Sequence, residues 1–230
     1  LMESSSFRML WIPGVDGATG HEDESPSITE QATEMFTDAK DALESCDFRY
    51  TDVIRTWCSL RRILDWYGEF NRVRTAFHEP LEINGTSEGR PFPASTGIQG
   101  TSRGEECTMD LLAFRALDGE SAARPILRSP RQDPPITYGS GFSRAMSIEH
   151  DGGDTILVSG TASIGPDGKT KHLDDPDAQV FETLMSLSAL LDPLGASLGD
   201  MASGTAFCKN AETYEAWFRV QRLLELPELP

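Results

Sequence analysis

A chain of 230 residues is long enough for one large domain or two small ones. The composition, 38% hydrophobic and 25% charged, is typical of a folded globular protein, and no stretch approaches the roughly 18–20 apolar residues that a membrane-spanning helix requires. The net charge of −17 opposes binding to a phosphate backbone, so we expect neither a membrane nor nucleic acid as a partner.

The cysteines and histidines are scattered along the sequence. Cys46, Cys58, Cys107 and Cys208 form no CxxC pair and the histidines are isolated, whereas a zinc site requires clustered ligands. We therefore expect no metal and no cofactor. Dispersed thiols are typical of reduced and mostly buried cysteines, and with no visible secretory signal they predict a cytoplasmic protein.

The first half of the chain predicts an α/β unit. A short apolar run at residues 7–13 precedes an amphipathic helix from Gln31, and a turn, a short strand and a second helix follow up to Arg74. The second helix carries aromatic and arginine side chains. Residues 106–117, ECTMDLLAFRAL, predict a further strand.

The second half repeats this order. Segments 143–150 and 154–164 predict a β-hairpin around a glycine-containing loop. From Gln179 the order of helix, turn, strand and helix returns, 148 residues after the copy that begins at Gln31. Proline and polar residues at 121–137 predict a linker between the two halves.

Two glycine-containing runs allow a functional and a structural interpretation. SIGPDGKT (163–170) resembles a phosphate-binding loop, but no helix opens at its lysine, so we expect a turn in which Gly168 takes a positive φ. PASTGIQG (93–100) and SGTASIG (159–165) predict either tight packing or a set of N–H and hydroxyl donors for a carboxylate. Neither has the context of a nucleophilic serine.

The second helix of the first copy offers cations for a small anion. Tyr67 and Arg74 lie seven positions apart and so share one helical face. Arg72 and Arg74 are suited to binding a carboxylate, since arginine can donate two parallel hydrogen bonds. The alternative is a solvent-facing arginine paired with Glu69 or Asp65. The arginines of this region that could together form a focused anion site are Arg55, Arg61, Arg62, Arg72 and Arg74.

These motifs carry a resemblance to a known family. YGSGFSRA (138–145), followed by ILVSGTASIGPDGKT, then Gln179, a helix and Asp200, resembles the RidA/YjgF family of reactive-intermediate deaminases. A weaker likeness covers residues 7–117. WYGEFNRVRTAF (66–77), with PASTGIQG and SGTASI, is similar to the two-lobed chorismatases.

The resemblance implies an α/β fold of two chorismate-mutase-like lobes in tandem, each a mixed β-sheet with two helices on one face. We expect a first lobe at 1–120, a linker at 121–137 and a second lobe at 138–230. The first lobe is expected to lack N-terminal strands and the second to lack C-terminal strands. Family members form trimers, so the resemblance also implies a homo-oligomer.

The activity implied is hydrolysis of a small unsaturated carboxylate, either an enamine or imine, or an enol ether. Arg74 and Arg144 would anchor the carboxylate, and Tyr67 and Thr161 would orient substrate or water. The alternative is a non-catalytic protein that binds small carboxylates or serves in assembly. The substrate-binding residues expected on this resemblance are Tyr67, Arg72, Arg74, Ser95, Thr96, Arg144, Ser159 and Thr161.

Three positions depart from the family pattern. Ser95 or Thr96 stands where the deaminases carry a carboxylate-binding arginine, and Phe114 stands where chorismatases carry a catalytic glutamate. Pro166 follows Gly165, where the family normally has a Gly-His pair. The sequence therefore leaves the catalytic acid or base unassigned.

Overall fold

The protein was analysed as a computed structural model that describes residues 1–17, 27–85, 89–100, 105–119, 122–150, 152–166 and 168–226. The chain divides into two compact units. Unit 1 comprises Leu1–Leu127 and Gly139–Gly160, and unit 2 comprises Arg128–Tyr138 and Thr161–Pro230. The lobe boundaries expected from the sequence were placed by resemblance to a family, whereas these two units are defined by how compactly the residues pack. The expected boundaries stay a prediction.

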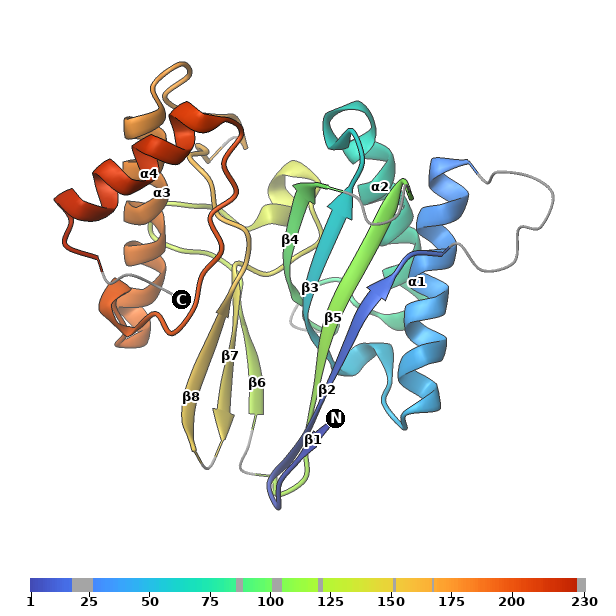
Figure 1. The fold of residues 1–230 in the computed structure, drawn as a ribbon. Helices are drawn as coiled ribbons and strands as arrows, with labels where there is room; N and C mark the ends of the chain where they lie inside the picture. Colours follow the sequence, from blue (N-terminus) through green and yellow to red (C-terminus); the bar gives the residue numbers. More distant parts are fainter. Residues whose placement is uncertain are drawn as a thin grey trace. The chain divides into compact units, whose positions relative to one another are not determined.

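Unit 1 is built on a five-stranded sheet with the order β1-β2-β5-β3-β4 (Figure 1). The sheet is mixed, because β3 runs parallel to β4 while its other pairings are antiparallel. The strand expected at 106–117 is confirmed as β5. The strands are β1 Met2–Glu3, β2 Phe7–Val15, β3 Val53–Leu60, β4 Ala94–Gln99 and β5 Cys107–Ala116.

Two helices cover one face of this sheet. α1, Ile28–Ser45, begins at Ser27, whose hydroxyl caps the helix in a capping box. α2, Ile63–His78, follows β3 directly. Their apolar side chains and those of β3 and β5 form one buried cluster, in which Phe36 and Phe70 are almost completely enclosed. This is the helix-on-sheet arrangement expected for the first half.

A second, antiparallel sheet completes unit 1. It consists of β6 (Ala122–Ile126), β7 (Ala145–His150) and β8 (Gly153–Val158) in that order. The hairpin expected around the glycine-containing loop is confirmed as β7–β8. The start of the expected linker is instead a strand, because the backbone of β6 bonds to β7 along its length.

The internal repeat is confirmed in the element order. α3, Pro176–Leu191, begins 148 residues after α1, and the Asp175 carboxylate caps it as Ser27 caps α1. α4, Ala211–Leu223, begins 148 residues after α2. α3 and α4 pack on each other through a small apolar core in unit 2.

The turn after the first helix repeats too. Asp47 and Gly195, again 148 residues apart, both take a positive φ. A short 3₁₀ turn follows in each copy, η1 at Tyr50–Asp52 and η5 at Leu198–Asp200. In both turns the final aspartate accepts a hydrogen bond of 2.8 Å from the backbone N–H three residues earlier. The offset of 148 residues therefore relates the helix caps, the turns and the first residues of the helices in the two copies.

The short strand expected in the second copy is wrong. Residues 201–208, the counterparts of β3, have no regular secondary structure. β3 bonds to β4 and β5, whereas among the residues described for unit 2 no strand lies beside 201–208. A strand needs a neighbour for its N–H and C=O groups, so the same local sequence pattern does not suffice.

The turn at Gly168 and the state of the cysteines can also be compared with the expectations from the sequence. Gly168 takes a φ of 74° and its N–H bonds to the Gly165 carbonyl at 3.0 Å, which confirms the turn. All four cysteines are free. Cys58 and Cys107 are buried as expected, but Cys46 is exposed. Within the described ranges no helix is both long and apolar enough to cross a bilayer.

Candidate functional site

The buried face of α2 carries a polar stripe. Asn71, Arg74 and His78 occupy positions i, i+3 and i+7, and their exposed fractions are only 8%, 5% and 1%. The positions of a helix that face a sheet are normally apolar, as the neighbouring position is, where Phe70 is buried. Polar groups buried in this way need partners, so the stripe marks the part of unit 1 with the most unusual chemistry.

Arg74 is a buried cation without a counterion. It donates from Nη2 to the Asn71 amide oxygen, and the Asn71 amide donates in turn to the Tyr67 carbonyl at 2.9 Å. The guanidinium lies 5.6 Å from the centre of the Phe70 ring and 5.9 Å from that of Phe142. Its Nε has no partner, and none of the described carboxylates forms an ion pair with it. The positive charge is therefore not compensated by any of the described carboxylates.

A second buried arginine lies on β3. Arg55 donates to the Thr56 carbonyl at 2.9 Å and to the Thr96 hydroxyl, and its guanidinium lies 4.4 Å from the centre of the Trp57 ring. Burial lowers the pKa of Arg55 to about 10. In the described part of the chain no aspartate or glutamate pairs with it. Two buried arginines that have no carboxylate partner among the described residues are unusual in a protein whose net charge is −17.

Hydroxyl groups connect β4 to the end of β8. The Thr56 hydroxyl donates to the Ser95 hydroxyl at 2.8 Å. The Ser95 N–H donates to the Ser159 hydroxyl at 2.9 Å, and that hydroxyl donates to the Ser143 carbonyl. The Gly160 N–H donates to the Ser95 carbonyl at 3.0 Å. These contacts join the two sheets of unit 1, so the packing interpretation of the two glycine-containing runs accounts for Ser95 and Ser159.

The structure brings some of the expected site residues together. Tyr67 lies one turn before Asn71 and stacks on Phe70, with the ring centres 6.3 Å apart. Arg144 is buried and its guanidinium lies 5.9 Å from the Phe142 ring that also neighbours Arg74. Thr96 bonds to Arg55. The ligand-binding roles given to these residues stay predictions.

Other expected residues lie apart from this cluster. The Arg72 side chain is 73% exposed and pairs with Glu69 at 2.7 Å, which is the solvent-facing alternative. Arg61 and Arg62 both pair with Glu106, so the five arginines do not form one site. Thr161 belongs to unit 2. Its part in a site shared with the residues above stays a prediction.

Sequence reasoning missed three members of the buried cluster. His78 was treated as an isolated histidine, but burial first and the charge of Arg74 second lower its pKa to about 3, so the ring is neutral. Burial raises the pKa of Tyr50 and of the Cys58 thiol well above their usual ranges. The signal that could have revealed His78 is its spacing from Asn71 and Arg74 on one helix face.

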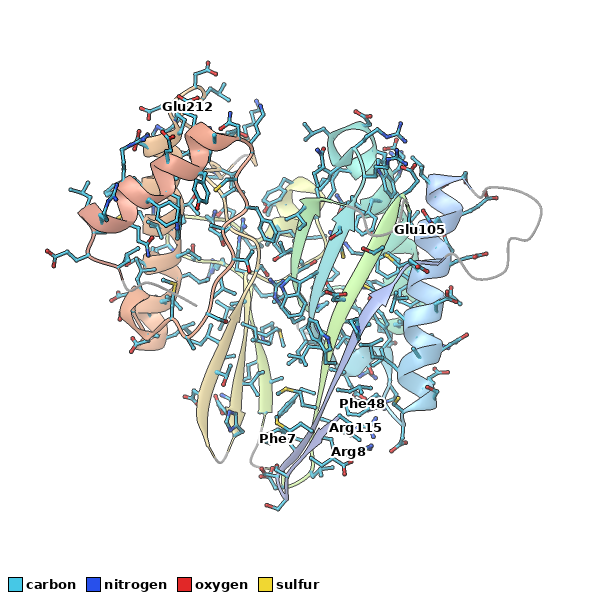
Figure 2. The ribbon with its side chains drawn as sticks, viewed as in Figure 1. Phe7, Arg8, Phe48, Glu105, Arg115 and Glu212 are labelled. Atoms are coloured by element: carbon cyan, nitrogen blue, oxygen red, sulfur yellow. The ribbon has the colours of Figure 1, made fainter. Side chains whose placement is uncertain are left out.

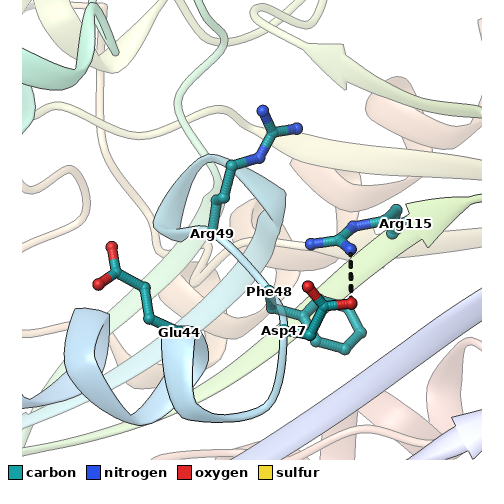
Figure 3. A pocket seen from close by; sticks show the side chains of 5 residues that line it. All are labelled: Glu44, Asp47, Phe48, Arg49 and Arg115. Carbon is teal, nitrogen blue, oxygen red and sulfur yellow. Dashed lines mark hydrogen bonds and ion pairs between the residues drawn. The ribbon is translucent and has the colours of Figure 1, made fainter.

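Two cavities of unit 1 are lined by residues other than the polar stripe of α2. One of them, about 460 Å³, is lined by Glu44, Asp47, Phe48, Arg49 and Arg115 (Figure 3). Arg115 pairs with Asp47 at 3.5 Å, and the guanidinium groups of Arg8 and Arg115 lie about 5 Å from the Phe48 ring (Figure 2). Each of these arginines already has a carboxylate partner. Among the described residues no group of three metal-binding side chains was found.

The fold is that of an α/β protein in which two helices cover one face of a mixed sheet. The order of a helix, a turn and a second helix occurs twice along the chain. No family model and no curated protein matches the sequence. A crystal structure of a chorismatase shares the fold, with a TM-score of 0.70 and 20% identity over 96% of this chain and 67% of that chain. The YjgF gene product from E. coli matches with a TM-score of 0.40 and 17% identity over 46% of this chain and 80% of that chain.

The chain therefore has the fold of that chorismatase structure, in agreement with the expected resemblance to the two-lobed chorismatases. The expected α/β class is confirmed. The expected mixed sheet with two helices on one face is found in the first half of the chain, whereas the second sheet, β6-β7-β8, is antiparallel. At 20% identity the likeness concerns the arrangement of the elements alone. What the chain binds has to be argued from its own residues.

Proposed function

We propose that this protein hydrolyses a small unsaturated carboxylate, an enamine, an imine or an enol ether, whose carboxylate binds Arg74. The observation that carries the proposal is the buried guanidinium of Arg74, which has one hydrogen-bond acceptor, Asn71, and no carboxylate partner within the described ranges. A ligand carboxylate would supply the missing charge and accept from Nε. Arg144 and Tyr67 near the same aromatic rings would contribute to orientation.

The proposal is tested by measuring the turnover of two substrates. The purified protein is incubated with freshly generated 2-aminoacrylate and, separately, with chorismate, and pyruvate release is measured against a blank. We expect release from at least one substrate and its loss in Arg74→Met. Arg124→Met is the matched control, because Arg124 is exposed and pairs with Glu149 on the neighbouring strand. Unchanged release in Arg74→Met would contradict the proposal.

A second candidate function is binding without catalysis. Phe114 stands where the chorismatases have their glutamate, and no carboxyl group in the described part of the chain bonds to Arg55 or Arg74. General acid catalysis would then depend on another group. Calorimetric binding of small carboxylates by a folded protein that releases no pyruvate would support this second function and overturn the first.

The assembly and location follow the same resemblance. We propose a homo-oligomer, a trimer by likeness to the RidA/YjgF family, in the cytoplasm. Light scattering coupled to size exclusion measures the number of subunits, and a monomer at micromolar concentration would contradict the assembly.

A further inference from the structure

One cavity of unit 1 carries charged groups of both signs. Its volume is about 460 Å³, which is within the range typical of small-molecule sites. Two of its five lining residues carry carboxylates, two carry guanidinium groups, and the fifth is a phenylalanine (Figure 3). The cavity shares no lining residue with the site proposed at Arg74. A ligand bound in it would therefore be a second one.

The end of α1 supplies the acidic side of this cavity. Glu44 lies in the last turn of the helix, and Asp47 follows the helix in a left-handed conformation with a φ of 59°. The last turn of α1 contains no basic residue. The carbonyl end of a helix carries a partial negative charge, which adds to the charge of the two carboxylates. This side of the cavity therefore attracts a cation.

Each of the two carboxylates has one engaged oxygen. Lys40 pairs with Glu44 Oε1 at 3.0 Å. Arg8 and Arg115 pair with Asp47 Oδ2 at 2.9 Å and 3.5 Å. Among the described residues none pairs with Glu44 Oε2 or Asp47 Oδ1, and at least half of each side chain is exposed. An ammonium group would find two acceptors there.

The turn after α1 and the end of β5 supply the basic side. The Arg49 guanidinium is largely exposed, and its Nη2 lies 3.6 Å from Asp52 Oδ1, which is longer than a hydrogen bond. Arg115 donates to Asp52 from Nε at 3.3 Å and from Nη2 at 2.8 Å. Its Nη1 contacts Asp47 at 3.5 Å, so three of the five N–H donors of Arg115 are used and two are left. The buried ring of Phe48, whose centre lies 4.9 Å from this guanidinium, helps to hold it in place.

The arrangement of these charges selects the class of ligand. In Figure 3 the Glu44 carboxylate lies at the left of the cavity, and the guanidinium groups of Arg49 and Arg115 lie to its right. A simple anion would bind the guanidinium groups but lie near two carboxylates. A simple cation would bind the carboxylates but lie near two guanidinium groups. Because like charges at close range oppose binding, only a molecule that carries both signs suits both sides.

We propose that this cavity binds a small zwitterion with one ammonium and one carboxylate group. The ammonium group contacts Glu44 and Asp47, and the carboxylate accepts hydrogen bonds from Arg49 and Arg115. Binding at this site involves no covalent step. It does not depend on the reaction proposed above, so the two proposals can fail separately.

Two matched series of ligands test the proposal. Glycine and 4-aminobutyrate are zwitterions; acetate and butyrate lack the ammonium group, and methylamine and butylamine lack the carboxylate. Each is titrated at neutral pH and low salt into the full chain labelled with nitrogen-15, and the amide shifts of Phe48 and Arg49 are followed by NMR. We expect at least one zwitterion to bind about 3- to 10-fold more tightly than both of its analogues, because each exposed ion pair contributes up to about fivefold.

Two variants each remove one side of the site. Arg49→Gln should lower the preference for the zwitterion over the amine by about threefold, and Glu44→Gln should lower the preference over the simple carboxylate by a similar factor. At least half of each side chain is exposed, so neither substitution disturbs the core. The matched controls are Arg124→Gln and Glu69→Gln, which change exposed residues elsewhere in unit 1 that also form an ion pair.

Every result counts for or against the site. Losses of preference in both variants, and in neither control, support it. Zwitterions that bind no more tightly than their analogues overturn it, and so does a preference that either variant retains or a loss that the controls share. Amide shifts confined to α2 also overturn it, but they agree with carboxylate binding at Arg74. Arg74→Met should leave the shifts of Phe48 unchanged, which separates the two sites.

Discussion

Replacing Arg74 by methionine should make the protein more stable and remove anion binding. Removal of the guanidinium relieves the burial of an unpaired charge, whose effective cost is several kcal/mol. The loss is one charge-assisted hydrogen bond to Asn71, worth about 1.5–3 kcal/mol, and weak contacts with two rings more than 5.5 Å away. Methionine fills the space with a flexible apolar side chain. The balance favours Arg74→Met by about 1–2 kcal/mol.

The measurement is thermal unfolding with and without pyruvate. For a chain of this length we expect Arg74→Met to raise the Tm by roughly 2–8 °C without ligand. Saturating pyruvate should raise the Tm of the wild type and leave that of the variant unchanged. Arg74→Lys, which keeps the charge and loses the bond to Asn71, should be less stable than the wild type. A fall in the Tm of Arg74→Met would refute the view of Arg74 as an uncompensated cation.

Other features of both units give three further expectations. The pKa of Glu182 is lowered to about 2, first by a hydrogen bond from Lys171, so the wild type should lose stability relative to Glu182→Gln as the pH falls from about 5 towards 2. Parallel Tm–pH curves of the two proteins would contradict this. Iodoacetamide should alkylate the exposed Cys46 in the native state and the buried Cys58 only in urea, as mass spectrometry would show. Leu111→Ala, at a fully buried position of β5, should cost about 2–5 kcal/mol in urea unfolding, and a loss below 1 kcal/mol would contradict its place in the core.

Local patterns in the sequence predicted the elements whose structure is decided locally. The helices from Gln31 and Gln179 have caps and apolar periodicity of their own, and the hairpin at 143–158 has a glycine-containing loop. Strands whose existence depends on a distant neighbour were harder. β6 contains Pro125 and was expected as linker, yet an edge strand tolerates proline and β7 provides the partner. Residues 201–208 were expected to form a strand, but no strand lies beside them among the described residues of unit 2, and they have no regular secondary structure.

The site could be predicted only in part, for a related reason. The sequence identified Arg72 and Arg74 equally well as anion-binding candidates, because composition and motif do not distinguish a buried arginine from an exposed one. Burial separated them, since the Arg72 side chain is 73% exposed and Arg74 is 5% exposed as a residue. Tyr50 and His78 gave no motif. Their importance comes from having no partner, which is a property of the packed core and not of any short segment.

The comparison of the two copies separates what the fold requires from what the site requires. At the offset of 148 that relates α4 to α2, Arg74 corresponds to Arg222, which is exposed. His78 likewise corresponds to Leu226. A helix of the same order and cap position thus forms in unit 2 without the buried cation. Because the architecture does not need a buried arginine there, the cost of burying Arg74 is better explained by a ligand than by folding.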